Sequence, residues 1–212
     1  DQTNLYYILG SSVETVARSP HLDTFRAHDL EVLYLVDPLD AFMVQSLREF
    51  EGKTLKNVDD PDLELPELET EAETPERADD MAPEVFGKLL VSFRNVLGDR
   101  VAEVRESKVL KGSPGRLVSP ESGPEADMQR VRRLLEEDYE VPPKILEINR
   151  GHKLIQNLAR LADQPAADSL VELSIEQLFG NLLLLEGLHP DPAQMVPRIE
   201  ELLERATDSS AA

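Results

Sequence analysis

The chain has 212 residues, a formal net charge of -20 at pH 7 and a hydrophobic content of 41%. This hydrophobic content is enough for one large core or two small ones, so the composition excludes a wholly disordered protein. The negative charge argues against nucleic acids and anionic membranes as partners, because both would repel the chain. The absence of cysteine excludes a disulfide framework and thiolate chemistry and fits a reducing compartment.

The sequence contains neither a transmembrane-length apolar run nor a signal peptide, so we expect a cytoplasmic protein. It begins with Asp1 instead of Met and enters the apolar run 5–9 almost at once. We therefore expect a fragment of a longer protein.

Residues 1–58 alternate between predicted strands and helices. Apolar runs at 5–9 and 31–36 predict two buried strands, and alternation at 53–58 predicts a third. Between them, Ser11 or Ser12 can cap a helix that runs to about Arg18, and Asp37-Pro38 opens a helix expected to continue through Phe50. This order predicts a small three-layer α/β subdomain with a mostly parallel sheet.

Residues 59–80 interrupt this pattern with eleven acids, three prolines and one base. The composition predicts an acidic linker or loop over 59–82. Such a segment is either a solvated connection or an acidic decoy for a basic partner.

Residues 83–212 are expected to form a second, mixed α/β domain. A strong amphipathic helix begins at Pro83 and is stopped by Gly98. Strands are expected at 101–110 and 116–118, paired as a hairpin, and at 144–148. Amphipathic helices are expected at 126–137 and from residue 150 onwards.

The stretch 169–206 predicts two helices joined by a turn over 187–190. The first helix is apolar almost all the way round, so it must be buried on more than one side. A second copy would cover it in an intermolecular four-helix bundle; the alternative is that the hairpin packs onto its own domain. The expected dimer interface comprises Val171, Ile175, Leu178, Leu182, Leu185, Val196, Ile199, Leu202 and Leu203.

The sequence shows no constellation of catalytic type. Gly10-Ser11-Ser12 after a strand could hold an anion, but it lacks the glycine-rich and lysine-containing nucleotide motifs. The four histidines lack metal-ligand spacing, and His152 and His189 beside turns indicate capping or surface groups. We therefore expect no metal site, no cofactor and no enzyme active site within these residues.

Two apolar surfaces are candidates for binding protein partners. The first is Phe42 and Met43 with Gln45, and the second is the stripe formed by Met128, Val131, Leu134 and Leu135. Ordinary core packing explains either surface. The second stripe contains a polarisable Met and is bounded by loop residues and Pro142-Pro143, which favours presentation to varied partners.

Several stretches together resemble the heat-shock protein 90 family of molecular chaperones, in its bacterial form. They are EVLYLVDPLDAFMVQSLREFEGKTLKNV, LGDRVAEVRESKVLKGSPGRLVS, KILEINRGHKLIQNL and NLLLLEGLHPDP, and the resemblance covers nearly the whole chain. It implies that residues 1–58 close the middle domain and that residues 83–212 form the C-terminal dimerisation domain.

The resemblance implies an ATP-driven dimeric clamp whose nucleotide pocket and catalytic arginine lie outside these residues. Homodimerisation and binding of unfolded client proteins would remain, with clients at Phe42, Gln45 and the second stripe. Phe42 stands where some members have Trp, and Ala41 where an acid is frequent, so the first surface departs from the family pattern. The ending DSSAA lacks the acidic tail that recruits tetratricopeptide co-chaperones, so none is expected. A dimerisation scaffold without client binding is the alternative.

Overall fold

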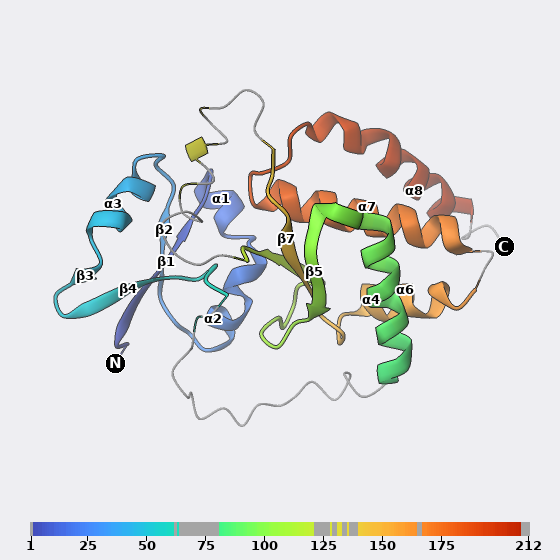
Figure 1. The fold of residues 1–212 in the computed structure, drawn as a ribbon, viewed down its shortest axis with the longest axis horizontal. Helices are drawn as coiled ribbons and strands as arrows, with labels where there is room; N and C mark the ends of the chain where they lie inside the picture. Colours follow the sequence, from blue (N-terminus) through green and yellow to red (C-terminus); the bar gives the residue numbers. More distant parts are fainter. Residues whose placement is uncertain are drawn as a thin grey trace.

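The computed structural model describes residues 2–61, 63, 81–120, 128, 131, 132, 135, 140–164 and 167–208. The described residues form a mixed α/β fold with two sheets, and each sheet has its own hydrophobic core. In Figure 1 the first sheet and its helices lie on one side of the molecule, and the second sheet with the longer helices lies on the other. The α/β fold class expected from the sequence is confirmed.

The first sheet has the strand order β2-β1-β4-β3. Its strands are β1 (Asn4–Leu9), β2 (Val32–Leu35), β3 (Glu49–Phe50) and β4 (Lys53–Asn57). Strands β2 and β4 run parallel to β1, with Val32 and Lys56 on either side of Tyr6, and β3 is antiparallel to β4. This arrangement is the mostly parallel sheet that the alternating sequence predicts.

Short helices cover the first sheet on both faces (Figure 1). Helix α1 (Val13–Val16), the 3-10 helix η1 (Pro20–Leu22) and α2 (Asp23–Ala27) lie towards the second sheet, and α3 (Asp40–Ser46) lies away from it. The core beneath the first group is built from Tyr6, Ile8, Val16, Leu22, Phe25 and Val58. The rings of Tyr6 and Phe25 meet edge to face at a centroid distance of 5.0 Å.

Helix α3 ends at Ser46, so the expectation that it continues through Phe50 is wrong. The chain instead turns into β3, where Phe50 is opposite Lys53 of β4. Glu51 (φ 50°) and Gly52 (φ 78°) both have left-handed backbones. Two consecutive residues with positive φ form the tight turn that matches the twist of a β-hairpin, so the hairpin overrides the helical periodicity.

The second sheet has the order β5-β7-β6. Its elements are α4 (Pro83–Leu97), the 3-10 helix η3 (Gly98–Arg100), β5 (Val101–Glu106), β6 (Gly115–Val118), β7 (Lys144–Ile148) and α6 (Lys153–Ala162). The expected hairpin between β5 and β6 is wrong, because β7 lies between them, parallel to β5 and antiparallel to β6. Every residue of β7 is buried, which explains why this strand takes the central place.

The chain ends in a helical hairpin made of α7 (Asp168–Leu185), the 3-10 helix η5 (Pro192–Met195) and α8 (Val196–Asp208). Gly187 (φ 68°) follows the end of α7, and the Asp191 side chain caps η5 by accepting a hydrogen bond from the backbone N–H of Ala193. Pro197 is the second residue of α8, so it marks the start of this helix.

The second core is built largely on α7 and α4, which pack against the second sheet. It includes Phe86, Leu89, Phe93, Leu146, Ile148, Ile155, Leu158, Val171, Ile175, Leu178, Phe179, Leu182 and Leu183. None of the helices in the described part of the chain could span a lipid bilayer by length and hydropathy.

Replacing Glu51 by Asn tests the turn between β3 and β4. A non-glycine residue with positive φ is strained, and Asn tolerates this backbone conformation better than Glu, so we expect the free energy of unfolding to rise by about 0.5–1 kcal/mol. Urea denaturation of Glu51→Asn and of the unsubstituted chain measures this change in the free energy of unfolding. The control is Glu49→Asn within β3, which is expected to give no increase; an equal increase there would contradict the turn assignment.

Candidate functional site

Helix α3 and the residues at its two ends carry apolar side chains that face solvent. The exposed fractions are 69% for Leu39, 46% for Phe42, 41% for Met43 and 36% for Leu47. Leu39, the residue before α3, lies three and four residues before Phe42 and Met43, which is the spacing that places side chains on one helical face. Leu47 follows the end of the helix and has a non-helical backbone. We call these four residues the α3 surface. It contains both apolar residues of the first predicted client site, Phe42 and Met43.

The α3 surface exists because the helix is apolar on two sides. Ala41 and Val44 are 3% and 6% exposed, so they are the side chains with which α3 packs. Gln45, the polar member of the predicted site, is half-buried. Since packing needs only Ala41 and Val44, the outer apolar residues are not explained by the core of this chain.

The described residues of the second predicted client stripe differ in how much of their side chain is exposed. Met128, Val131 and Leu135 are helical, as expected, but Val131 is 6% exposed, Met128 is half-buried and Leu135 is 77% exposed. Leu134 lies outside the described residues. Val131 therefore has no accessible surface for a client, whereas Leu135 does.

Four of the residues expected at the dimer interface belong to the core of the chain itself. Val171, Ile175, Leu178 and Leu182 are at most 5% exposed and pack within the second core. The expectation for these four is corrected, because side chains already buried in one protomer cannot be covered by another. The alternative raised by the sequence, a hairpin that packs onto its own domain, describes this face of α7.

Helix α8 is the part of the hairpin that leaves apolar residues exposed. Val196, Ile199 and Leu203 are 50%, 39% and 59% exposed, and Leu202 is half-buried. On α7, the predicted Leu185 is half-buried and its neighbour Leu184 is 45% exposed. Val196, Ile199 and Leu203 share one helical face by their spacing.

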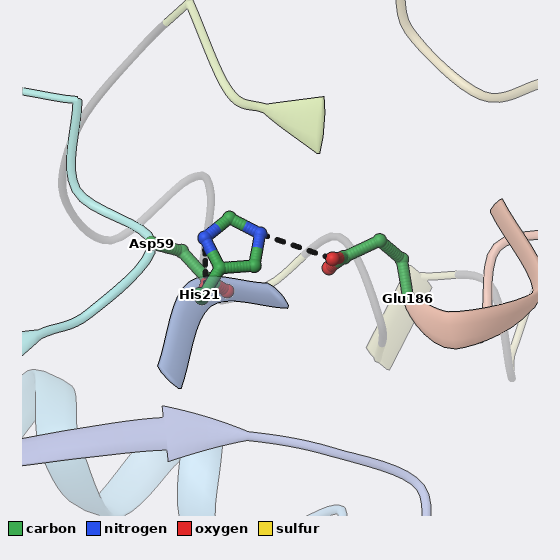
Figure 2. Close-up of side chains that lie close together, drawn as sticks. All are labelled: His21, Asp59 and Glu186. Carbon is green, nitrogen blue, oxygen red and sulfur yellow. Dashed lines mark hydrogen bonds and ion pairs between the residues drawn. The ribbon is translucent and has the colours of Figure 1, made fainter. Parts of the chain in front are cut away.

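A buried ion-pair cluster joins the two halves of the molecule, and no motif in the sequence predicts it. The side chain of His21 on η1 is fully buried, and its Nδ1 lies 3.1 Å from Oδ1 of Asp59, which follows β4. Its Nε2 lies 3.0 Å from Oε1 of Glu186 at the end of α7. Figure 2 shows the imidazole between the two carboxylates, with one ring nitrogen towards each.

This cluster favours a charged imidazole. Burial alone would lower the pKa of His21, but the carboxylates of Asp59 and Glu186 raise it above the ordinary value. Burial also raises the pKa of Asp59, although His21 opposes that shift. Lys144 has its pKa lowered by burial and acts on both carboxylates, as a further cation near the cluster.

The cluster is better explained as an ion pair than as a metal site. Among the described residues, the potential ligand atoms of His21, Asp59 and Glu186 do lie within 4.8 Å of one another. However, the two ring nitrogens of His21 face different carboxylates, so one ion could not use both contacts (Figure 2). The positive charges of Lys144 and Arg116 nearby would also disfavour a cation.

Further contacts around His21 hold the two halves together. The Asp23 carboxylate accepts hydrogen bonds from the backbone N–H groups of Gly112 and Ser113, at 3.0 Å and 2.7 Å, and from the Ser113 hydroxyl. The hydroxyl of Thr24 donates to the carbonyl of Val109. The segment from η1 to α2 is therefore docked on the loop between β5 and β6 as well as on α7.

Two other positions from the sequence have local structural roles. The Nδ1 atom of His152 accepts a hydrogen bond from the backbone N–H of Leu154 and caps α6, as expected for a histidine beside a turn. Ser12 caps α1, accepting from the backbone N–H of Thr15. Because α1 has four residues, it offers little of the helix dipole that an anion site would use.

Comparison with known proteins identifies relatives along the whole chain. The family model described as Hsp90 protein matches residues 1–212. Chaperone protein HtpG of Oleidesulfovibrio alaskensis is 37% identical over 209 residues, which cover 97% of this chain and 33% of that protein. HtpG of Chlorobaculum tepidum is 37% identical over 211 residues, covering 98% and 33%, respectively. HtpG of Desulfitobacterium hafniense is 38% identical over 206 residues, covering 97% and 32%. The chain thus spans about a third of the length of the curated relatives it matches.

The raised pKa of His21 predicts that stability falls as pH rises. A folded-state pKa above the unfolded value of about 6.5 gives stabilisation that is fully present below that value and lost as pH passes through the folded pKa. The raised pKa of Asp59 also makes stability fall as pH rises, beginning at the unfolded value of about 3.9. We expect the free energy of unfolding to decrease from about pH 6 towards alkaline pH, and less so in His21→Gln.

Removing the buried imidazole also leaves two carboxylates without their cation, so His21→Gln is expected to lose about 3 kcal/mol at pH 6. Urea denaturation at several pH values measures both effects. His28→Gln, at a histidine outside the cluster, is the control. An unchanged pH dependence in His21→Gln would contradict the assignment of the charge to His21.

Proposed function

The chain belongs to the Hsp90 family of chaperones, and on that premise we propose that it dimerises and binds non-native client proteins. The observation that carries this proposal is the α3 surface, where four large apolar side chains face solvent although the chain's own packing does not need them. Contiguous exposed apolar side chains are typical of protein-binding sites. Unfolded polypeptides expose the apolar side chains that such a surface would cover.

The clients are proposed to contact Phe42 and Met43 first, with the exposed Leu39 and Leu47 at the two ends of α3 adding to the α3 surface. Leu135 and the half-buried Met128 provide a second contact, from which Val131 is excluded by its burial. The soft, flexible Met side chains suit partners of varied sequence. In a dimer each surface occurs twice, so weak apolar contacts add through a raised effective concentration.

The dimer is proposed to form through α8. Val196, Ile199 and Leu203, with Leu184 of α7, are the exposed apolar residues of the hairpin, and covering them would contribute several kcal/mol at about 25 cal/mol per Å². A two-fold axis beside α8 would bring two hairpins together as a four-helix bundle. This proposed interface keeps the α8 residues expected from the sequence. It does not include the buried residues of α7, which belong to the second core.

The remaining expectations from the family resemblance stay proposals. We propose that these residues hydrolyse no ATP by themselves, act in the cytoplasm and do not bind nucleic acid. A dimerisation scaffold without client binding is the second candidate, and the exposure of the α3 surface argues against it.

Client binding is tested by the double substitution Phe42→Ser with Met43→Ser. Both side chains are more than two-fifths exposed, so their loss is expected to weaken binding of a fluorophore-labelled, permanently unfolded polypeptide about tenfold while leaving the unfolding free energy nearly unchanged. Fluorescence anisotropy measures the affinity. Val91→Ser, at a 58% exposed position of α4, is the matched control. Equal affinity of the double variant and the control would leave the scaffold as the better explanation.

Dimerisation is tested by Ile199→Glu with Leu203→Glu. We expect the dissociation constant from sedimentation over a dilution series to rise roughly 100-fold, because four carboxylates would face one another across the axis. Helical content should remain, since both residues are exposed. Leu182→Glu should instead lose the fold, because Leu182 is 3% exposed within the core. A double variant that still dimerises like Val91→Glu would refute the α8 interface.

A further inference from the structure

Helix α8 packs on the rest of the chain through its polar side. None of its residues is buried, and the half-buried ones lie at the spacing of one helical face: Arg198, Glu201, Leu202 and Arg205. Only Leu202 among these is apolar, whereas Val196, Ile199 and Leu203 are exposed. Figure 1 shows α8 lying along α7 at the edge of the molecule. Because so little apolar surface joins the two helices, polar contacts must determine which face of α8 points outwards.

Arg198, on this inner side, is paired with Glu176 of α7. Its Nη1 donates to Oε2 of Glu176 at 3.2 Å, and the two side chains are 21% and 29% exposed. Salt screens such a partly buried pair less than a fully exposed one. Arg205, two turns further along α8, reaches α7 through the neutral hydroxyl of Ser169, at 3.0 Å. The pair between Glu176 and Arg198 is therefore a charged and partly shielded contact between the two helices.

Glu176 is itself fixed by Arg100 at the end of η3. Nη1 of Arg100 donates to Oε2 of Glu176 at 2.9 Å, and Nη2 donates to Oε1. The same guanidinium donates to the backbone carbonyls of Val96 and Leu97 at the end of α4, both at 3.1 Å. It also lies over the ring of Phe179, 5.5 Å from the centroid. A bidentate contact fixes the orientation of both groups, so Arg100 holds the Glu176 carboxylate on the body of the domain.

Anchoring Arg198 sets the rotation of α8 about its own axis. Successive residues of an α-helix are about 100° apart, so Val196 and Ile199 point away from the direction of Arg198. With Arg198 directed at Glu176, both apolar side chains remain exposed, at 50% and 39%. An interface that is already held in its bound orientation loses less conformational freedom on association. The contact should therefore strengthen any dimer that forms through the outer face of α8.

We infer that Glu176 is a positioning residue for the α8 dimer interface. Held by Arg100, its carboxylate anchors Arg198 and so presents the outer apolar face of α8 to a second copy of the chain. This inference rests on the proposed dimerisation through α8. It adds a group that acts through the orientation of α8 instead of through contact with the second copy.

Glu176→Gln tests the positioning role in the full 212-residue chain. The substitution keeps the shape of the side chain but removes the charge that both arginines face. We expect the dimer dissociation constant, from sedimentation over a dilution series, to rise about tenfold. An unchanged dissociation constant would overturn the inference.

Glu147→Gln is the matched control, because Glu147 also lies between two arginines. Its carboxylate is 2.7 Å from both Arg105 and Arg116, but on the second sheet and with the side chain only 6% exposed. Its loss should lower the free energy of unfolding more than Glu176→Gln does, yet leave the dissociation constant within about twofold, as for an independent site. Equal increases in the dissociation constant would attribute the effect to lost stability and overturn the inference.

Two substitutions of Arg198 test the same role from α8. Arg198→Lys keeps a charge that can donate to Glu176, whereas Arg198→Met keeps only an aliphatic side chain. We expect the dissociation constant to rise about tenfold in the Met variant and less than about threefold in the Lys variant. Circular dichroism should show the same helical content in both, since Arg198 is not buried. Equal dissociation constants of the two variants would overturn the role of the charge pair.

The double variant Ile199→Glu with Leu203→Glu separates this inference from the proposed function. If it dissociates the dimer while Glu176→Gln has no effect, dimerisation through α8 stands and the positioning role falls. If the double variant leaves the dissociation constant unchanged, the proposed α8 interface falls, and the positioning role falls with it.

Discussion

The burial of α7 is the constraint on which the rest of this structure depends. Ile175 is fully buried, and Val171, Leu178, Phe179 and Leu182 are at most 5% exposed. The helix therefore contributes buried side chains to the second core along most of its length. Glu186, the residue after the last turn of α7, contacts the imidazole of His21 on η1. The helices of the first sheet therefore pack against the end of the same helix. One helix thus organises the core and the junction between the two halves, which leaves other elements to present surface.

The exposed apolar surfaces are the basis for the proposed client binding and dimerisation. Helix α3 packs through Ala41 and Val44, and α8 packs through side chains other than Val196, Ile199 and Leu203, yet both helices remain apolar on their outer sides. Exposed apolar groups cost stability in water unless something covers them. We propose a second copy of the chain as the cover for α8 and a non-native client as the cover for α3.

The sequence predicted local structure well wherever local physics decides it. The start of α4 at Pro83, the turn at Gly187 and the cap at His152 all follow from residue types that favour those backbone positions. The sequence did not predict contacts between residues that are far apart along the chain. His21 and Glu186 are 165 residues apart, and neither has spacing that indicates the other. The place of β7 between β5 and β6 is likewise a matter of long-range pairing. The all-round apolar character of α7 indicated burial, but only the fold shows that the covering surface is the chain's own.

The most direct test of this account is amide hydrogen exchange on the full chain with and without a permanently unfolded polypeptide. The account predicts added protection in residues 39–50 on binding, and protection along α8 that depends on protein concentration but not on the polypeptide. Protection that spares residues 39–50, or an α8 insensitive to concentration, would contradict the division of the surface into a client site and a dimer interface.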